Sequence, residues 1–364
     1  MSPTQTRKKK VKTIVVKPVL TDEEINKLEG NYHDGKGFQI INYDADVYGE
    51  DKTAPGGRKL LAKFRKGVFN KELTDLAWDA FHKAAAPSRN RGAAGGPIDP
   101  KSPYWKKRKV TDIDKWSARY IQNGKVSKMR VNNNVFSSVL GYFEETPFMG
   151  LPCRMTSYTQ TYFKGYKKGI PYIQAIDKEF KHLIPDRHAD QLKRNKANPS
   201  YQIADTAFSS VTINRNFRTA LHKDAGDYKG GYGNLSVIER GKYHGGETLF
   251  PKWGVGFDLR TGDFIAMDVH EMHGNTALYE TKEDKEFNKK LPPVYKHSGD
   301  TGTMGSEFPF TRISFVCYLR EKLHDCDPKE TRKYYKKIEF DPEKGSLKKK
   351  TTTRKQAVKK DAEE

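Results

Sequence analysis

Apolar residues in several segments of the first half of the chain recur every three or four positions, which is the period of an amphipathic helix. The pattern predicts helices over residues 21–30, 71–85 and 171–184, and a polar, basic helical continuation over residues 186–198. Thr21 is a typical N-cap for the first helix, and Gly30 is a typical residue at its end. The first half of the chain is therefore expected to be mainly helix and loop.

From about Ala207 the pattern changes to short apolar runs separated by Gly, Asn and Asp. Such runs indicate short β-strands. We predict strands over residues 207–214, 233–239, 246–251, 254–259, 262–268 and 312–319. This rhythm is typical of an antiparallel sandwich or barrel with helices packed outside it.

These patterns divide the chain into four parts. Residues 1–20 are expected to form a basic, flexible arm, and residues 21–130 a helical and loop part that packs on the core. Residues 131–340 would form the β core, with an inserted polar loop at about residues 280–310. Residues 341–364 read as a basic, disordered tail because they are rich in Lys and Thr.

The charge of the chain indicates a polyanionic partner. There are 67 Lys and Arg against 46 Asp and Glu, a formal net charge of +21, of which the two ends carry +6 each and the body +9. A basic body favours nucleic acid over a membrane surface. In the stretch YWKKRKV, Lys106, Lys107 and Arg108 stand beside two aromatic residues, a mixture that suits phosphate contact and base stacking. An ordinary solvated loop is the alternative interpretation of this stretch.

The three cysteines, Cys153, Cys317 and Cys326, are odd in number and lack metal-type spacing. We therefore expect no disulfide framework and a reducing compartment. No apolar run approaches the length that spans a bilayer, and the basic N-terminus is not followed by the apolar region of a secretory signal. The expectation is a protein that is neither membrane-bound nor secreted, in the nucleus if the source is eukaryotic and in the cytoplasm otherwise.

One group of residues has the composition of a metal site. The stretch NFRTALHKDAGD contains His222 and Asp224 in a His-x-Asp arrangement, and His270 and His273 follow further along the strand region. Two imidazoles and one carboxylate on neighbouring strands can form a facial triad, which holds Fe(II) on one face and leaves positions open for a co-substrate and O₂. The alternative for the first stretch is a solvated turn.

The motifs HKD, GGETLFP, GDFIAMD, HGN and RISFVCYL, within about residues 130–325, resemble the core of Fe(II)/2-oxoglutarate dioxygenases. TINRNFRTALHKDAGD and HGN resemble the TET/JBP branch in particular, and CRMTSYT resembles an element of its viral and algal members. The resemblance implies an α+β fold with a double-stranded β-helix (jelly-roll, cupin-like) core and flanking helices. It also implies Fe(II), 2-oxoglutarate and O₂ as cofactors and co-substrates, with ascorbate as an alternative to 2-oxoglutarate.

The resemblance assigns roles to individual residues. His222, Asp224 and His273 match the iron ligands, and the HGN context favours His273 over His270. Arg312 and Ser314 alternate along one strand and match the site for the distal carboxylate of 2-oxoglutarate. Three further residues are weaker candidates: Arg154 for the other carboxylate, and Tyr158 and Asn214 for the lining of the pocket.

Asp227 lies where TET-like enzymes place a polar residue against the target base. A carboxylate accepts a hydrogen bond from the exocyclic amine of cytosine, whereas thymine presents an acceptor there. The expected reaction is therefore oxidation of 5-methylcytosine in DNA to 5-hydroxymethylcytosine by a monomeric enzyme. The alternatives are thymine oxidation to 5-hydroxymethyluracil, a prolyl or lysyl hydroxylase, and a nucleic-acid-binding module without activity; a turn-capping role is the alternative for Asp227.

Overall fold

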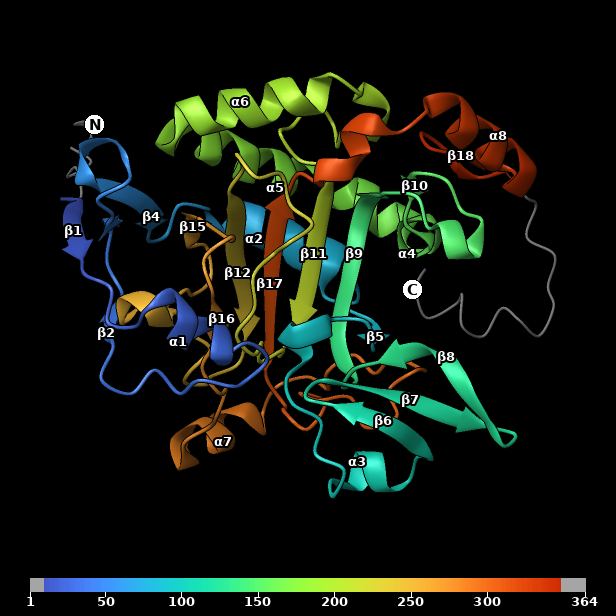
Figure 1. Ribbon diagram of the computed structural model, residues 1–364, viewed down its shortest axis with the longest axis horizontal. Helices are drawn as coiled ribbons and strands as arrows, with labels where there is room; N and C mark the ends of the chain where they lie inside the picture. Colours follow the sequence, from blue (N-terminus) through green and yellow to red (C-terminus); the bar gives the residue numbers. More distant parts are fainter. Residues whose placement is uncertain (1–9, 348–364) are drawn as a thin grey trace.

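Two β-sheets form the centre of the computed structural model, which describes residues 10–347 (Figure 1). The larger sheet has ten strands in the order β1-β3-β4-β15-β12-β17-β11-β9-β10, with β5 paired to β9, and only the β1–β3 pair is parallel. Its strands are β1 (Lys12–Val16), β3 (Ala45–Glu50), β4 (Arg58–Arg65), β5 (Pro87–Ser88), β9 (Val135–Phe143), β10 (Arg154–Met155), β11 (Ser210–Arg215), β12 (Gly233–Arg240), β15 (Phe264–Met267) and β17 (Thr311–Tyr318).

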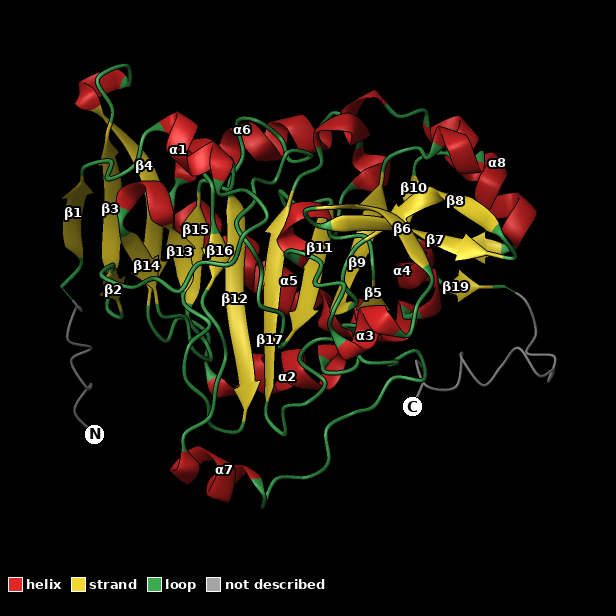
Figure 2. Ribbon diagram, turned by 60° about the horizontal axis from the view of Figure 1, so that its bottom comes forward, coloured by secondary structure: helices red, strands yellow, loops and turns green. Residues whose placement is uncertain are grey.

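The smaller sheet lies against one face of the larger one, as Figure 2 shows. It has the order β16-β13-β14-β2 and consists of β2 (Gln39–Ile41), β13 (Thr248–Phe250), β14 (Val255–Phe257) and β16 (Gly274–Asn275). An apolar core fills the space between the sheets, where Phe64 and Val237 of the large sheet share one buried cluster with Phe250 and Phe257 of the small sheet. Burial of these side chains is the main force that holds the two sheets together.

Helices cover the opposite face of the large sheet. The helices α2 (Lys71–Phe81) and α5 (Phe163–Leu183) share a second apolar core with the sheet, and α6 (Pro185–Lys196) follows α5 directly (Figure 1). The side chains of β17 alternate between the two faces of the large sheet. Its odd-numbered residues Ile313, Phe315 and Cys317 are buried in the helix-side core, whereas its even-numbered residues face the other way, as expected from strand alternation.

The remaining elements are short and lie around the two sheets. A separate sheet of β6 (Val110–Asp114), β7 (Ser117–Gln122) and β8 (Lys125–Val131) projects at the lower right of Figure 1 next to α3 (Pro103–Lys106). The other helices are α1 (Asp22–Lys27), α4 (Ser157–Thr161), α7 (Lys282–Asn288) and α8 (Pro328–Ile338). The short 3₁₀ turns are η1 (Pro55–Gly57), η2 (Gly92–Gly95), η3 (Pro147–Met149), η4 (Pro199–Tyr201), η5 (Pro251–Trp253) and η6 (Glu321–Asp325), and a hairpin of β18 (Phe340–Asp341) and β19 (Gly345–Ser346) follows α8.

The four predicted helical segments and the six predicted strands from residue 207 onward are all present. The prediction for the first third of the chain was incomplete, because residues 21–130 also supply β3 and β4 to the large sheet and form the β6–β8 sheet. Residues 12–16 of the expected flexible arm form β1, and residues 340–346 form a hairpin; residues 1–9 and 348–364 lie outside the described part. The sequence of β4 intersperses Lys and Arg with apolar residues, so its identity as a strand depends on pairing with β15, about 200 residues away.

The expectation of no disulfide was wrong. Cys153 and Cys326 form a disulfide with their Cα atoms 6.1 Å apart, and Cys317 is a buried free thiol. The bond joins positions 173 residues apart, and spacing along a sequence carries no information on such a tertiary approach. The inference of a reducing compartment rested on the absence of this bond and loses its support. Among residues 10–347, no helix is long and apolar enough to cross a membrane.

Candidate active site

His222 and His273 are held side by side by their main chains. His222 N–H donates to the carbonyl of His273 at 2.9 Å, and His273 N–H donates to the carbonyl of His222 at 3.0 Å. The pair forms an antiparallel bridge just after β11 and just before β16, which brings the two imidazole rings within 4.4 Å between centroids. The segment that follows β11 of the large sheet and the residue before β16 of the small sheet thus each bring one imidazole to the same point.

Both rings are oriented by local backbone contacts. Nδ1 of His222 lies 2.8 Å from the carbonyl of Ala220, and Nδ1 of His273 lies 2.9 Å from the carbonyl of Glu271. A carbonyl can only accept, so each Nδ1 carries the proton and each Nε2 keeps a free lone pair. Burial, together with the nearby His273, lowers the pKa of His222 to about 4. The neutral imidazole that results is the form that binds a metal.

Asp224 completes the cluster. Its carboxylate oxygens lie 3.6 Å from Nε2 of His222 and 3.8 Å from Nε2 of His273, and the three candidate ligand atoms all lie within 4.8 Å of one another. His270 lies outside this group, because its Nδ1 faces Asp268 at 3.3 Å. Two imidazoles and one carboxylate, without a thiolate, are the donor set that suits non-haem Fe(II), so these residues fit the metal.

A cavity of about 350 Å³ opens from this cluster into the space between the two sheets. Alternation along the strands determines its lining: the even-numbered residues of β17 face the cavity, and those of β11 do the same. Asn214 and Ser314 are opposite one another in the β11–β17 register, and Ser137 of β9 is opposite Asn214 on the other side. The lining includes Ser137, Thr212, Asn214, Thr219, Asn275, Arg312, Ser314, Val316 and Tyr318.

Arg312 is the buried cation of this cavity. Its side chain is almost inaccessible to solvent, one Nη donates to the carbonyl of Gly246 at 3.3 Å, and its Nε has no hydrogen-bond partner. A buried guanidinium with an unused donor is unfavourable unless an anionic ligand completes it. Ser314 lies on the same strand face, and its hydroxyl is buried beside it. Arg312 and Ser314 therefore fit a carboxylate ligand such as the distal end of 2-oxoglutarate.

Asp227 lies in the same cavity, close to Arg320. It is 8% exposed, one of its carboxylate oxygens has no partner, and its backbone pairs with that of Arg320. Burial raises the pKa of Asp227 well above its usual range, the neighbouring Asp224 raises it further, and Arg320 opposes the shift. The guanidinium of Arg320 forms a two-pronged ion pair with Glu144.

Two lining arginines were absent from the residues that the sequence singled out. Arg320 continues the even-numbered face of β17 by one step, so strand alternation already contained a signal for it. Arg91 enters the cavity from the loop before η2, and its buried Nε also has no partner. This Gly-rich loop has no helix or strand periodicity, so only the tertiary structure shows that Arg91 lines the cavity.

Arg154 and Tyr158 are not among the residues that line the cavity. The guanidinium of Arg154 instead donates to the carbonyl of Pro152 at 2.8 Å and approaches Thr146. The hydroxyl of Tyr158 donates to the carbonyl of Lys83, and its ring stacks on Tyr162. Both residues belong to the polar and aromatic contacts around β10 and α4, and their roles in the site stay predictions.

The basic stretch after residue 104 lies next to the β6–β8 sheet. Lys106 and Lys107 are exposed. Arg108 covers the ring of Tyr104 with its guanidinium 3.4 Å from the ring centre, and Trp105 is 2% exposed with its indole N–H bonded to Asn133. Trp105 therefore serves the packing of this segment, whereas Tyr104 is half-buried with one ring face covered by Arg108. Base stacking by this stretch stays a prediction.

Comparison with known proteins agrees with the geometry of the site. Residues 138–321 match the Tet_JBP family, described as the oxygenase domain of the 2OGFeDO superfamily. The chain is 30% identical over 191 residues to the bifunctional helicase and thymine dioxygenase JBP2 of Leishmania infantum, covering 51% of this chain and 15% of that protein. It is 34% identical over 169 residues to the thymine dioxygenase JBP1 of Trypanosoma brucei brucei, covering 46% of this chain and 19% of that protein.

A solved structure of NgTET1 in complex with 5mC DNA aligns with 88% of this chain and 98% of its own length, at 11% identity and a TM-score of 0.46. The site and the match together define an oxygenase domain of the iron- and 2-oxoglutarate-dependent class. Within that class, the chain belongs to the Tet_JBP family. It spans less than a fifth of the length of the two relatives described above.

Proposed function

We propose that this protein oxidises the 5-methyl group of a pyrimidine base in DNA, using Fe(II), 2-oxoglutarate and O₂. The observation that carries the proposal is that the His222–Asp224–His273 cluster and Arg312, whose Nε is unpaired, line the same cavity. The family assignment supports the class of reaction. The relatives named as thymine dioxygenases support a methylated pyrimidine as substrate.

The residues of the cavity have distinct tasks in this proposal. His222, Asp224 and His273 hold Fe(II), which supplies the O₂-dependent oxidation of a C–H bond when 2-oxoglutarate is bound. Arg312 and Ser314 bind and orient the distal carboxylate of 2-oxoglutarate. The walls between the sheets position the base so that its methyl carbon lies next to the metal position. The target base must leave the duplex to reach the recessed metal ligands, because a methyl group in a stacked helix cannot enter the cavity.

We also infer that the two sheets form a double-stranded β-helix. In support of this, β12, β17 and β11 of the large sheet are consecutive antiparallel neighbours, and the short antiparallel pairs β13–β14 and β13–β16 lie opposite them. The candidate metal ligands lie where the two sheets meet, between β11 and β16. A jelly-roll with its site between the sheets accounts for this arrangement.

Asp227 favours 5-methylcytosine as the base. Its free carboxylate oxygen faces the cavity and can accept a hydrogen bond from the exocyclic amine of cytosine. Burial raises the pKa of this carboxyl group, and the nearby Arg320 opposes that shift toward the ionised form that accepts the bond. On this proposal the product is 5-hydroxymethylcytosine.

Thymine is the second candidate, and two observations favour it. The matched relatives are named thymine dioxygenases. Burial also raises the pKa of Asp227, and a protonated carboxyl group can donate to O4 of thymine. The product would then be 5-hydroxymethyluracil.

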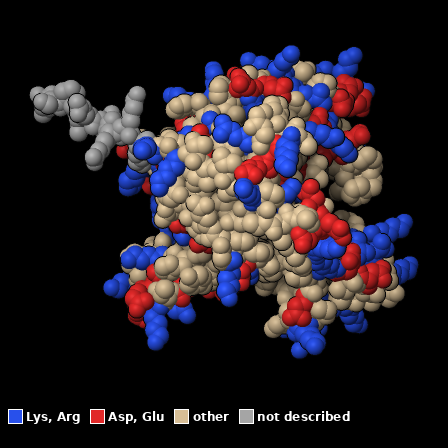
Figure 3. Space-filling model, turned by 60° about the vertical axis from the view of Figure 1, so that its left-hand side comes forward, with Lys and Arg blue, Asp and Glu red and all other residues tan. Residues whose placement is uncertain are grey.

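The proposed DNA contacts involve the projecting β6–β8 sheet. Lys106, Lys107, Lys125 and Lys128 are exposed there and can neutralise phosphates. The face at the other edge of the large sheet is less suitable, because its basic and acidic side chains are interspersed (Figure 3). Ion pairs such as Lys252–Asp22 and Lys59–Glu271 neutralise cations near that edge.

Nucleoside mass spectrometry tests the proposal. Purified protein, Fe(II) and 2-oxoglutarate would be incubated aerobically with one duplex containing 5-methylcytosine and one unmodified duplex. New 5-hydroxymethylcytosine that disappears in His222→Ala supports the first candidate, and 5-hydroxymethyluracil from either duplex supports thymine. Asp227→Asn is expected to lower turnover of the accepted base about tenfold with little change in 2-oxoglutarate binding. If no oxidised base forms with either 2-oxoglutarate or ascorbate, the proposal fails, and a protein substrate becomes the hypothesis to test.

A further inference from the structure

The turn between β9 and β10 exposes two adjacent apolar side chains at its tip. Phe148 is 76% exposed and Met149 is 59% exposed, which are among the largest exposures of bulky apolar residues in the described chain. Both belong to η3, between Pro147 and Gly150. A Phe–Met pair that points into solvent loses hydrophobic stabilisation unless a partner covers it.

The backbone of this turn is firmly held. Thr146 and Leu151 exchange two main-chain hydrogen bonds at 2.7 and 3.3 Å, which close the turn at its neck. Gly150 has a φ of 63°, a left-handed conformation that a glycine adopts without strain. Arg154 donates to the carbonyls of Pro152 and Glu144 and approaches the hydroxyl of Thr146. The tip is therefore displayed on a rigid support.

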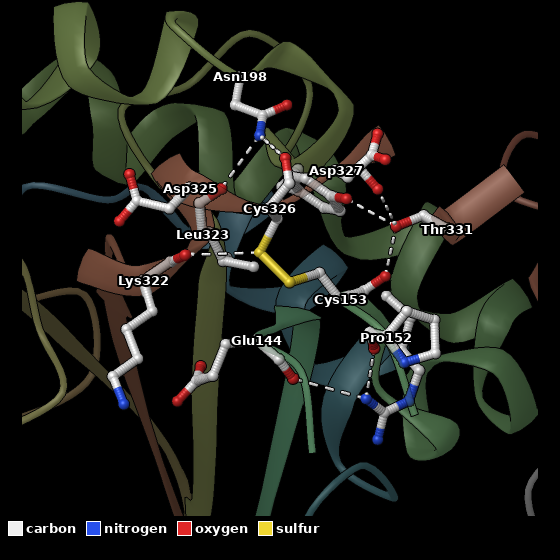
Figure 4. The surroundings of a disulfide bond; sticks show 12 residues. Glu144, Pro152, Cys153, Asn198, Lys322, Leu323, Asp325, Cys326, Asp327 and Thr331 are labelled. Atoms are coloured by element: carbon white, nitrogen blue, oxygen red, sulfur yellow. Dashed lines mark hydrogen bonds between the residues drawn. A yellow bond between two sulfur atoms is a disulfide. The ribbon is translucent and has the colours of Figure 1, made fainter. Parts of the chain in front are cut away.

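A disulfide anchors the same turn to a distant part of the chain. Cys153, three residues after Gly150, is bonded to Cys326, which follows η6 (Figure 4). Thr331 of α8 also donates its hydroxyl hydrogen to the carbonyl of Cys153, at 2.5 Å. A covalent bond and a buried hydrogen bond thus fix the base of a turn whose tip makes no contribution to the core.

The turn begins at the wall of the active-site cavity. Glu144 is the first residue of the turn, and both of its carboxylate oxygens pair with the guanidinium of Arg320. The backbone of Arg320 in turn pairs with that of Asp227. Arg320 and Asp227 both line the cavity. Only three residues separate Glu144 from Phe148, so a short segment connects the apolar tip to the ion pair with Arg320 at the wall of the cavity.

We propose that Phe148, supported by Met149, inserts as an apolar wedge into the base stack of duplex DNA beside the target nucleotide. The inference rests on the proposed function, since it explains how a base that must enter the cavity is kept out of the helix. An apolar side chain between two base steps compensates for part of the lost stacking and opens the duplex. The rigid support is consistent with this role, because a mobile tip would lose ordering entropy on insertion.

The first test compares oxidation of duplex and single-stranded DNA by the full chain. Phe148→Ala is expected to lower the turnover of a duplex about tenfold and to leave the turnover of the same single strand within about twofold, because a single strand needs no wedge. Phe148→Leu, which keeps an apolar side chain, should recover most of the duplex activity. Val19→Ala is a control at another exposed apolar side chain, since Val19 is 62% exposed and lies next to Gly254, which follows η5. Equal losses on duplex and single strand in Phe148→Ala would overturn the wedge.

A second test does not depend on turnover. A duplex with 2-aminopurine next to the target pyrimidine becomes more fluorescent when the stack opens, so wild-type protein should raise its fluorescence, and Phe148→Ala and Met149→Ala should reduce that rise. A wild-type rise without any oxidised product would support the wedge while refuting the proposed function. Oxidised product with the same fluorescence rise in wild type and Phe148→Ala would refute the wedge alone. Absence of both signals would refute both proposals.

Discussion

The main chain of His222 is hydrogen-bonded in both directions to that of His273, across the junction of the two sheets. This pairing places two Nε2 atoms next to the carboxylate of Asp224, and the carbonyls of Ala220 and Glu271 determine which nitrogen of each ring is free. The position of the ligands is therefore set by backbone contacts, and their side chains are already arranged for a metal.

Loss of one of these imidazoles should remove the iron. We expect His222→Ala and His273→Ala to lower the affinity for Fe(II) at least about 100-fold, because two remaining ligands cannot form the facial triad. Anaerobic equilibrium dialysis followed by elemental analysis would measure the affinity of each variant for Fe(II). His270→Ala is the matched control and should bind iron like the wild type, since His270 faces Asp268. Loss of iron in His270→Ala with retention in His273→Ala would reverse the assignment.

Arg312 should determine the affinity for 2-oxoglutarate. Arg312→Met is expected to raise the Kd about 10- to 100-fold, as for the loss of a charge-assisted hydrogen bond in a buried site. Calorimetry under anaerobic conditions with Mn(II)-loaded protein would measure this. Arg154→Met is the control with a second buried arginine, and its Kd should not change because Arg154 lies outside the cavity. Similar increases in both variants would indicate a general loss of structure.

The contact between His270 and Asp268 predicts a pH-dependent contribution to stability. The hydrogen bond that the His270 ring donates to Asp268 raises the pKa of His270 above its ordinary value of about 6.5. Its contribution is therefore fully present below that value and is lost as the pH rises through the raised pKa. In metal-free protein, His270→Ala should lower Tm more at about pH 6 than at about pH 9, by an energy below about 1 kcal/mol. Asp268→Asn should abolish the difference between the two pH values, and an equal effect at both would contradict the prediction.

The disulfide should stabilise the fold under oxidising conditions. Reduction, or Cys326→Ser, is expected to destabilise the protein by about 2–4 kcal/mol, because the bond closes a long loop in the unfolded chain. Thermal denaturation with and without a phosphine reductant would show a lower Tm in the reduced state. Cys317→Ser controls for loss of a thiol, and its Tm should still respond to the reductant. A Tm that is unchanged by reductant in the wild type would show that the bond does not form in solution.

Much of the β core could be predicted because its signals are local. The runs around β11, β12, β15 and β17 are apolar and bounded by turn residues, and the alternation along β17 places Arg312 and Ser314 on one face. The stretch with His222 and Asp224 and the HGN motif at His273 contain the right ligand types in order. These features depend on a few neighbouring residues, so they can be predicted from the sequence alone.

The tertiary structure alone decided the rest, for a common physical reason. β4 is a strand because β3 and β15 pair with it, Cys153 is oxidised because the fold brings Cys326 to it, and Arg91 lines the cavity because a loop folds over the site. Arg154 was expected in the site and instead supports the turn that carries Phe148. The sequence by itself determined the kinds of element and the chemistry of the metal ligands, through periodicity and side-chain type. Which distant residues meet was decided by packing and pairing across the whole chain, since these interactions depend on distances in space that the order of residues does not contain.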